Sequence, residues 1–576
     1  MPIPFASTFR TSARGFRWPG LNDTQRFLLL SILIGVFAGL LVVCFHLAIE
    51  FIRWISIDPA PGASILRKVL SPAIGALIAV LLATKAFKAA RGSGVSNTKA
   101  AVYISNGLVP FGAVIGKFLA CSVSIGTGNS LGPEDPSLHM GAGVASALGR
   151  AFRLTRERMR LIAPVGAAAG LAAAFNTPIA AVLFVIEEVV AGWSAAVLGS
   201  IMLSAVSAAV VVRWFLGDRP LFFVPAFEIT SATELLPYAV VGLIGGLLSV
   251  VFVRTIEKLR TWLERFPPNT AYLRSAAAGL AVGITGIWLP EVMGAGYGAI
   301  DGAMHNRFAW DMLVILALVK MGVTLLCFGA GTPGGMFAPT LFIGGMIGGG
   351  IGGLASLYWP FPSSGASAYV LVGMGTFFAG VFRAPMTSIF MVFEVSATYV
   401  IILPVMIANT VAFLVSRRLQ PRPFFSMVAR HEGLELPSLE QEREAQPVRV
   451  EDAMSPAART LNPDTTVAAA LEASRRDEAV LVSLGQGAWC HVSLQDLEAA
   501  IFRGDGERKL GDEFALTPLP RLFPDLPLEA ALRLFGSHPV LPVSSRMRPY
   551  RLLGVLTLRD VYRVYEIEEP AKPAWQ

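Results

Sequence analysis

KFLACSVSIGTGNSLGPEDPSLHMGAG at residues 117–143 and KMGVTLLCFGAGTPGGMFAPTLFIGGM at residues 320–346 are two copies of one pattern. A constant shift of 203 residues aligns them without a gap and superposes their lysines, four glycines and a proline. The copies differ in charge, because Glu134 of the first stands opposite Phe337 of the second. A carboxylate inside such an apolar repeat is costly, and residues of this kind commonly mark an ion or proton pathway.

The composition of the 576-residue chain is typical of a membrane protein. Hydrophobic residues make up 54% of the chain, charged residues 15%, and the mean hydropathy is +0.60, which is far too apolar for a soluble protein of this length. Half of the 40 acidic residues follow residue 440, so carboxylates are scarce in the apolar part. The net charge of +7 arises from basic residues in loops between apolar runs, which favours membrane orientation over nucleic-acid binding.

A second duplicated block supports two related halves. Phe175 and Glu187 correspond to Phe382 and Glu394 at a shift of 207 residues. Several apolar stretches are too short to cross a bilayer, which predicts broken or re-entrant helices. We therefore expect an all-α polytopic membrane domain built from two repeats.

Changes in composition give the domain boundaries. The apolar runs occupy residues 24–430, after an N-terminal segment at residues 1–23 and before a linker at residues 431–447. Charged sequence with helix-like and strand-like runs then predicts a soluble α/β tail. The tail is itself doubled, with modules at residues 448–501 and 509–564.

Three glycine-rich turns are candidate anion sites. Gly132-Pro-Glu-Asp-Pro136 and Gly335-Met-Phe-Ala-Pro339 each precede a predicted helix, and a proline in the opening turn suits a helix N-terminus. Free N–H groups at such an end bind anions without a cationic side chain, because the helix dipole lies behind them. Ser93 in a third turn, Arg91-Gly-Ser-Gly-Val-Ser96, could donate a hydroxyl hydrogen bond, although such a sequence is more often only a turn.

These motifs resemble those of the CLC family of chloride channels and proton-coupled chloride exchangers, over nearly the whole chain. Gly92-Ser93-Gly94 resembles the family's first anion-binding loop, the turn at Gly132 its GxEGP loop, and the turn at Gly335 its GxFAP loop. Residues 167–188 resemble its segment that ends in paired glutamates. The resemblance implies a homodimer with one pathway per subunit, inverted repeats, and an anion held at helix N-termini. The implied chloride-binding positions are Ser93, Met336, Phe337 and Phe425, and the implied anion loops contain Gly92, Gly94, Gly132, Pro133, Asp135 and Gly335.

Two glutamates are candidates for proton transfer. By resemblance Glu134 is the gating glutamate, and the residues agree, since a carboxylate at a helix N-terminus mimics the anion and protonation removes that competition. Glu187 has a repeat partner in Glu394, which favours a shared structural role such as bonding loop amides. Glu188 stands opposite Val395 and so lacks a counterpart, which favours function. It resembles the internal proton-transfer glutamate of exchangers, and the alternative is a helix-end carboxylate facing water.

Two positions depart from the family pattern. Asp135 stands where the family usually has glycine, and it would either shift the proton affinity of the gate or cap a helix. Phe425 stands where the family commonly has a tyrosine whose hydroxyl reaches the anion. One donor is therefore missing, which predicts weaker anion occupancy and looser coupling. For His139, a packing or hydrogen-bonding role is the better interpretation than a proton relay.

The tail resembles a pair of CBS modules, which in this family lie on the cytoplasmic side. Ser493, Asp496, Thr557 and Asp560 match the places where such pairs hold a nucleotide. The alternatives are an adenine nucleotide site and a pair that only braces a dimer.

The sequence therefore predicts a chloride/proton antiporter, not an enzyme, with chloride as its bound ion and no metal or cofactor. It is expected to be a homodimer in the plasma (inner) membrane, surrounded by lipid, with cytoplasmic termini and no nucleic-acid partner. The nearest alternative is a passive voltage- or pH-gated chloride channel of the same fold. A cation transporter would need clustered membrane carboxylates, and a regulatory protein would place the main activity in the tail.

Overall fold

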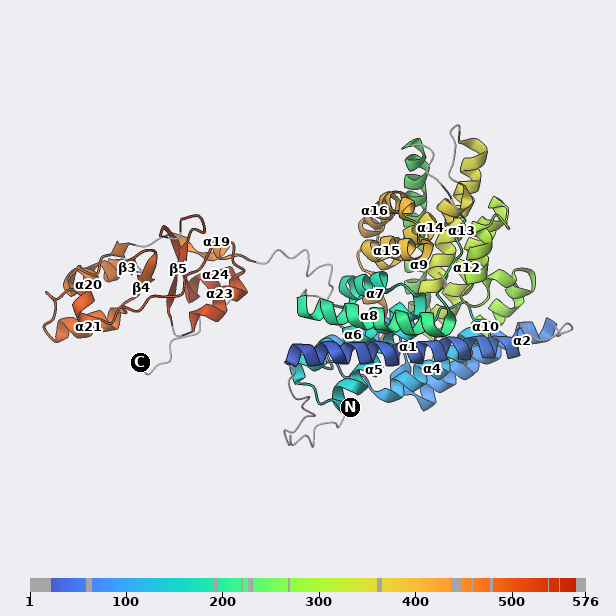
Figure 1. Cartoon of the computed structure of the whole chain (residues 1–576), viewed down its shortest axis with the longest axis horizontal. Coiled ribbons are helices and arrows are strands. Elements are labelled where there is room, and N and C mark those ends of the chain that lie inside the picture. Colours follow the sequence, from blue (N-terminus) through green and yellow to red (C-terminus); the bar gives the residue numbers. More distant parts are fainter. Residues whose placement is uncertain are drawn as a thin grey trace. The chain divides into compact units, whose positions relative to one another are not determined.

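Figure 1 shows the computed structural model of the chain. It describes residues 22–565 except 58–64, 191–194, 219–220, 226, 228–231, 268–269, 360–364, 437–447, 457–458, 477–479, 537 and 549. All but the last two residues of the predicted N-terminal segment, and most of the predicted linker, lie outside the described residues. The chain forms two compact units, Met1–Glu442 and Arg443–Gln576, and each is described by itself.

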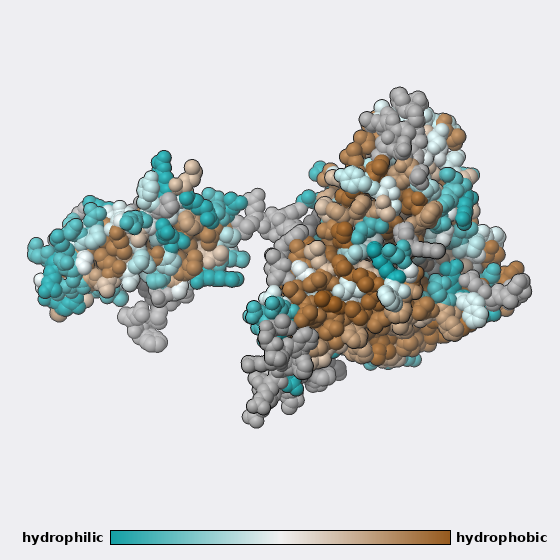
Figure 2. Space-filling view, in the orientation of Figure 1, coloured by the Kyte–Doolittle hydropathy of each residue, from teal (hydrophilic) through white to brown (hydrophobic). Residues whose placement is uncertain are grey.

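The first unit is helical. Among the described residues, eight helices are long and apolar enough to cross a membrane. They are α1 (Asp23–Ser56), α2 (Ile65–Leu81) with the π-turn η1 (Leu82–Ala86), α6 (Arg156–Phe175), α8 (Ala195–Leu216), α9 (Leu235–Leu263), α12 (Trp310–Gly329), α13 (Phe337–Tyr358), and α16 (Ile402–Leu419) with η7 (Tyr399–Ile401). Figure 2 shows a broad hydrophobic surface over the region of α1 and α8, as a lipid-facing surface requires.

Shorter helices fill the interior of this unit. They are η2 (Lys88–Ala90), α3 (Gly94–Tyr103), α4 (Phe111–Gly126), α5 (Glu134–Ala151), α7 (Pro178–Phe184), η3 (Val185–Val189), η4 (Ala232–Glu234), α10 (Ala271–Trp288), η6 (Pro290–Val292), α11 (Tyr297–Met304), α14 (Ala366–Phe382), α15 (Pro385–Ser396) and α17 (Phe424–His431). Asn176 interrupts α6 and α7, and Arg383 interrupts α14 and α15, each with a left-handed φ of 56°. The two breaks lie 207 residues apart, at the shift of the second duplicated block, and they confirm the predicted broken helices.

Matching glycines set the packing of both halves. α5 packs on α6 through Gly141 and Gly166, and α13 packs on α14 through Gly344 and Gly373. A Cβ at Gly141 would lie 2.2 Å from the Gly166 carbonyl oxygen, and a Cβ at Gly344 would lie 2.3 Å from the Gly373 oxygen. Each helix pair therefore approaches closely only because both surfaces carry glycine.

The turns before the duplicated helices are also alike. Gly128 has a φ of +101° and Gly331 a φ of +82°, a left-handed conformation that glycine adopts without strain. These two residues coincide at the 203-residue shift of the opening motif. The chain therefore reverses in the same way before α5 and before α13.

The second unit is α/β. One sheet has the order β1 (Ser455–Pro456), β6 (Leu552–Thr557), β5 (Val540–Ser544) and is antiparallel throughout. The other has the order β2 (Thr460–Leu461), β3 (Leu481–Gly485), β4 (Ala488–Cys490), with β2 parallel and β4 antiparallel to β3. The helices are α19 (Val450–Ala453), α20 (Val467–Arg476), α21 (Leu494–Phe502), α22 (Leu510–Glu513), α23 (Leu528–Phe535) and α24 (Leu558–Val564). Two hydrophobic clusters, one for each sheet and its helices, agree with the predicted doubling.

Alanine at Gly141 tests the glycine packing. We expect Gly141→Ala to lower the thermal midpoint of the purified protein, because the added methyl group meets a backbone oxygen that cannot rotate away, at a cost of about 1–3 kcal/mol. Gly322→Ala in α12 is the matched control, since nothing lies within 4 Å of its added Cβ and alanine favours helix. Equal losses in the two variants would contradict the proposed role of Gly141.

Candidate functional site

Two backbone hydrogen bonds join the duplicated loops. The Gly132 amide donates to the Gly335 carbonyl at 2.8 Å, and the Gly335 amide donates to the Gly132 carbonyl at 2.7 Å, as an antiparallel bridge. α5 begins two residues after Gly132 and α13 two residues after Gly335. Two helix N-termini therefore converge in the interior, as the sequence predicts.

Glu134 lies at the N-terminus of α13. Its side chain is fully buried, its Oε2 accepts a hydrogen bond from the Ala338 amide at 3.3 Å, and its Oε1 accepts one from the Tyr297 hydroxyl. The carboxylate thus occupies the place that an anion would take at this helix end. The predicted anion positions Met336 and Phe337 immediately precede and begin the same helix.

Tyr297 escaped the sequence analysis, although the duplication contained its signal. α11 begins at Tyr297 and α3 begins at Gly94, which is again a separation of 203 residues. The buried lysines obey the same relation, since Lys117 donates to the Gly92 carbonyl and Lys320 donates to the Gly294 carbonyl. The turn before α11 is therefore the repeat counterpart of the Ser93 turn.

A cavity of about 660 Å³ leads to Glu134 from one side. Its lining includes Pro133, which precedes Glu134, and Tyr297, which bonds to it. Charged side chains also line the cavity, namely Glu50, Arg53, Lys68 and Glu291. Ions and protons can therefore approach the Glu134 carboxylate through a polar vestibule.

Asp135 lies at the other predicted anion turn. Its Oδ1 accepts from the Ser93 hydroxyl at 2.9 Å and from the Val95 amide at 3.0 Å, and its Oδ2 accepts from the Gly94 amide at 2.7 Å. The residue is 3% exposed. Of the two readings that the sequence left open, capping is therefore seen, but the capped helix is α3 at the predicted chloride site.

Glu432 is a further carboxylate at this turn. It follows α17, and its Oε1 accepts from the Ser93 amide at 2.7 Å. Burial raises the pKa of the Glu432 carboxyl above its ordinary value, whereas the nearby Arg260 and Lys117 cations and the Ser93 hydrogen bond oppose that rise. Sequence reasoning placed Glu432 at the start of the linker, where no motif marks its contact with Ser93.

Phe425 belongs to an aromatic cluster beside the site. Its ring stacks on Phe382 with centroids 5.1 Å apart, and Phe382 stacks on Phe337 at 4.9 Å. Phe184 meets both Phe337 and Phe425 edge-on. The position therefore contributes apolar packing next to α13 and has no hydroxyl to offer an anion.

Glu188 is buried and paired. It lies in η3 at 8% exposure, and Lys99 of α3, which is 2% exposed, donates to its Oε1 at 2.8 Å. Lys99 was not singled out by the sequence analysis, because nothing local relates it to a residue 89 positions away. Glu188 therefore does not face water, in contrast to the alternative that the sequence left open.

The repeat-related glutamates cap each other's helices. Glu187 accepts from the amides of Met386 and Thr387 at 3.1 and 2.8 Å at the start of α15. Glu394 accepts from the amides of Ile179 and Ala180 at 3.0 and 2.8 Å at the start of α7. These bonds confirm the predicted shared structural role. His139 likewise has the predicted hydrogen-bonding role, with its Nδ1 3.1 Å from the Thr98 hydroxyl.

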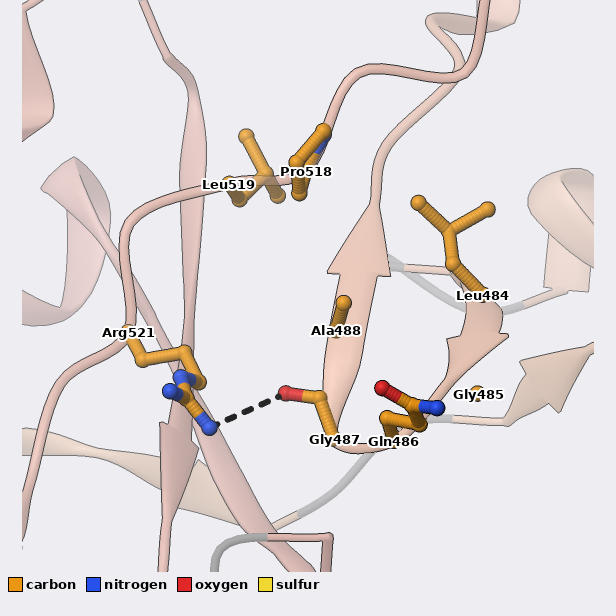
Figure 3. Close-up of a pocket in the computed structure, with 8 residues that line it drawn as sticks. All are labelled: Leu484, Gly485, Gln486, Gly487, Ala488, Pro518, Leu519 and Arg521. Atoms are coloured by element: carbon orange, nitrogen blue, oxygen red, sulfur yellow. Dashed lines mark hydrogen bonds between the residues drawn. The ribbon is translucent and has the colours of Figure 1, made fainter.

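The four predicted nucleotide residues begin two helices of the second unit. The Ser493 hydroxyl accepts from the Asp496 amide at 3.1 Å at the start of α21, and the Thr557 hydroxyl accepts from the Asp560 amide at 3.2 Å at the start of α24. Figure 3 shows a separate pocket of about 470 Å³ between the β3–β4 hairpin and residues 518–521. Arg521 reaches across it to the Gly487 carbonyl at 3.4 Å.

Comparison with known proteins adds the family relationship. Residues 74–417 match the family described as voltage gated chloride channel. The putative chloride channel protein ClcB-like of Ralstonia nicotianae is 32% identical over 387 residues, which cover 65% of this chain and 90% of that protein. The H(+)/Cl(-) exchange transporter ClcA of Vibrio cholerae is 29% identical over 430 residues, which cover 72% and 91%. The X-ray structure of a slow cyanobacterial Cl-/H+ antiporter superposes with a TM-score of 0.66 at 25% identity, over 72% of this chain and 98% of that one.

Removal of a helix cap tests the observed role of Thr557. We expect Thr557→Val to destabilise the second unit by about 1 kcal/mol, because the first turn of α24 loses its side-chain acceptor. Hydrogen exchange at the amides of α24 would report the loss as faster exchange. The exposed loop residue Thr517 supplies the control Thr517→Val, and a similar effect there would argue against capping.

Proposed function

The chain belongs to the CLC family of voltage gated chloride channels, and we propose that it is a proton-coupled transporter that exchanges chloride for protons. One observation carries the proposal, namely the buried Glu134 carboxylate at the N-terminus of α13 with a polar vestibule beside it. The relatives named exchange transporter and antiporter support the same reading. No covalent step is needed, so transport follows from competition and proton binding.

Glu134 is the proposed gate. When ionised, its carboxylate takes the amide of Ala338 and excludes an anion from that helix end. When protonated, it loses the charge that the helix N-terminus attracts, so chloride competes successfully and the side chain can move toward the vestibule. Chloride entry and proton uptake are thereby linked at one residue.

Glu188 is the proposed proton-transfer residue on the other side. Its burial keeps it from exchanging protons freely with water, and Lys99 stabilises its ionised form. Proton uptake by Glu188 removes the counter-ion of the buried Lys99 ammonium, which is a costly step. We expect proton entry at this pair to limit the turnover of the exchanger.

A passive chloride channel of the same fold is the second candidate. Phe425 favours it, because the site lacks the hydroxyl donor that would hold the anion during exchange. The relative named chloride channel protein agrees with this candidate. The two functions differ in whether a chloride gradient drives protons uphill.

The proposed assembly is a homodimer in the plasma (inner) membrane with cytoplasmic termini. Exposed apolar side chains on α8 and α16, such as Val206, Val210, Leu403 and Met406, suit either lipid or a second subunit. The antiparallel bridge between Gly132 and Gly335 supports inverted halves, because it relates the two loops as a two-fold axis would.

The second unit is proposed to be a CBS pair. Its two sheets and two hydrophobic clusters suit a pair of small modules. An adenine nucleotide is a candidate ligand at Ser493, Asp496, Thr557 and Asp560, where the helix N-termini of α21 and α24 would face phosphate. In the structure these four side chains bond to one another in pairs, so a ligand would have to share or replace those bonds.

Flux from reconstituted vesicles tests the exchange. We expect a chloride gradient to drive protons uphill in the native protein and not in Glu134→Gln or Glu188→Gln, since neither amide can carry a proton. Chloride and external pH would be followed together in the same vesicles. Asp311→Asn, at an exposed position in α12, should transport as the native protein does. Chloride flux without proton movement in the native protein would select the passive channel.

Tyr297→Phe tests the newly found partner of Glu134. A hydrogen bond to a charged group contributes about 1.5 kcal/mol, so loss of this donor should move the midpoint of the pH–flux profile upward by about one unit. The direction follows because the hydroxyl stabilises the ionised carboxylate, and its removal lets protonation occur at higher pH. Tyr272→Phe, at an exposed position of α10, is the control, and an unchanged profile in Tyr297→Phe would refute the role.

A further inference from the structure

The Asp135 carboxylate lies in the turn where the family resemblance places chloride. It receives three hydrogen bonds of 2.7–3.0 Å, from the Ser93 hydroxyl and from the Gly94 and Val95 amides. These are the donors that a helix N-terminus and its serine would offer to an anion. The carboxylate is almost completely buried, so these donors are its replacement for water.

This arrangement differs from ordinary helix capping. An aspartate near a helix start commonly accepts from amides of its own helix. Asp135 is the second residue of α5, yet its carboxylate bonds to the first turn of α3. Its neighbour Glu134 bonds to the first turn of α13. One end of α5 therefore sends a carboxylate to each of the two converging anion turns.

The donors of the Ser93 turn are committed. A hydroxyl group has one proton to donate, so Ser93 cannot bond to Asp135 and to a chloride ion at once. The Ser93 amide is bonded to Glu432 at 2.7 Å. Phe425 supplies no donor of its own. Chloride can therefore occupy this turn only after the Asp135 carboxylate has left it.

We propose that Asp135 is a second tethered anion, which fills the Ser93 position and competes with chloride there. The inference rests on the proposed chloride transport, because it concerns occupancy of the same pathway. Glu134 then guards one anion turn and Asp135 guards the other. Central chloride binding in this chain is accordingly weaker than the same backbone would give with glycine at residue 135.

The charges around Asp135 set the strength of this competition. Glu134 precedes it on α5, Glu432 approaches after α17, and the Cys121 thiol interacts with it from α4. Lys117 of α4 is the cation at the turn, where it donates to the Gly92 carbonyl. Two neighbouring carboxylates repel the Asp135 charge, while Lys117 and the three donors hold it in place.

Chloride binding to the full-length protein tests the inference. Titration calorimetry with chloride, in detergent and with isethionate as the replacement anion, would compare the native protein with Asp135→Gly and Asp135→Asn. We expect the chloride Kd to fall by about tenfold or more in Asp135→Gly, because the donors of the Ser93 turn become available. Asp135→Asn removes the charge while keeping the shape, and it should also bind chloride more tightly. Native-like affinity in the folded variants would overturn the inference.

Ser93→Ala in both backgrounds gives a second, independent readout. In Asp135→Gly the serine hydroxyl is free to bind chloride, so its removal should weaken binding several-fold. In the native background the hydroxyl is already bonded to Asp135, so Ser93→Ala should change the chloride Kd little. A purely structural cap predicts instead that Ser93→Ala has the same effect on chloride in both backgrounds, and that result would refute the competition.

The two proposals fail separately. Tighter chloride binding in Asp135→Gly, together with a native protein that moves no protons uphill, would support the tethered anion and reject the exchange. Uphill proton movement in the native protein, together with an unchanged chloride Kd in Asp135→Gly and Asp135→Asn, would support the exchange and reject the tethered anion. If Asp135→Gly is not monodisperse, Asp135→Asn alone decides the outcome.

Discussion

The reciprocal backbone hydrogen bonds between Gly132 and Gly335 are the constraint on which the site depends. They fix the starts of α5 and α13 against each other in the interior of the helical unit. Side chains at either position would block the contact, since an added Cβ would lie 2.9 Å from Ala338 or from the opposite loop. The anion turns therefore exist because two glycine loops from distant parts of the chain pair directly.

Once two helix N-termini meet in an apolar interior, something negative must satisfy them. Glu134 and Asp135 do so in the absence of a bound ion, each at the first turn of a different helix. This exchange of a mobile anion for a tethered one makes proton binding relevant, because a carboxylate loses its competitive charge when it is protonated. Asp135 extends the same physics to a second turn and leaves fewer donors for chloride.

The rest of the helical unit supports these charges. Lys117 and Lys320 bind the carbonyl groups of the Gly92 and Gly294 turns, so each repeat uses one buried cation to hold one loop. Glu187 and Glu394 exchange caps between the halves, which fixes the broken helices α7 and α15. The duplication thus supplies a symmetric frame, and the unpaired residues within it carry the proposed transport chemistry.

The sequence by itself determined the helical membrane unit, the doubled frame, the broken helices and the two converging anion turns, because glycine, proline and apolar runs act locally and recur at fixed shifts. It also identified Glu134 and the structural role of Glu187. Only the tertiary structure decided which donors these carboxylates meet. Tyr297, Lys99 and Glu432 reach the site from segments far along the chain, and no local pattern records such contacts. The direction of the Asp135 side chain, toward α3 rather than its own helix, was likewise set by packing between distant segments.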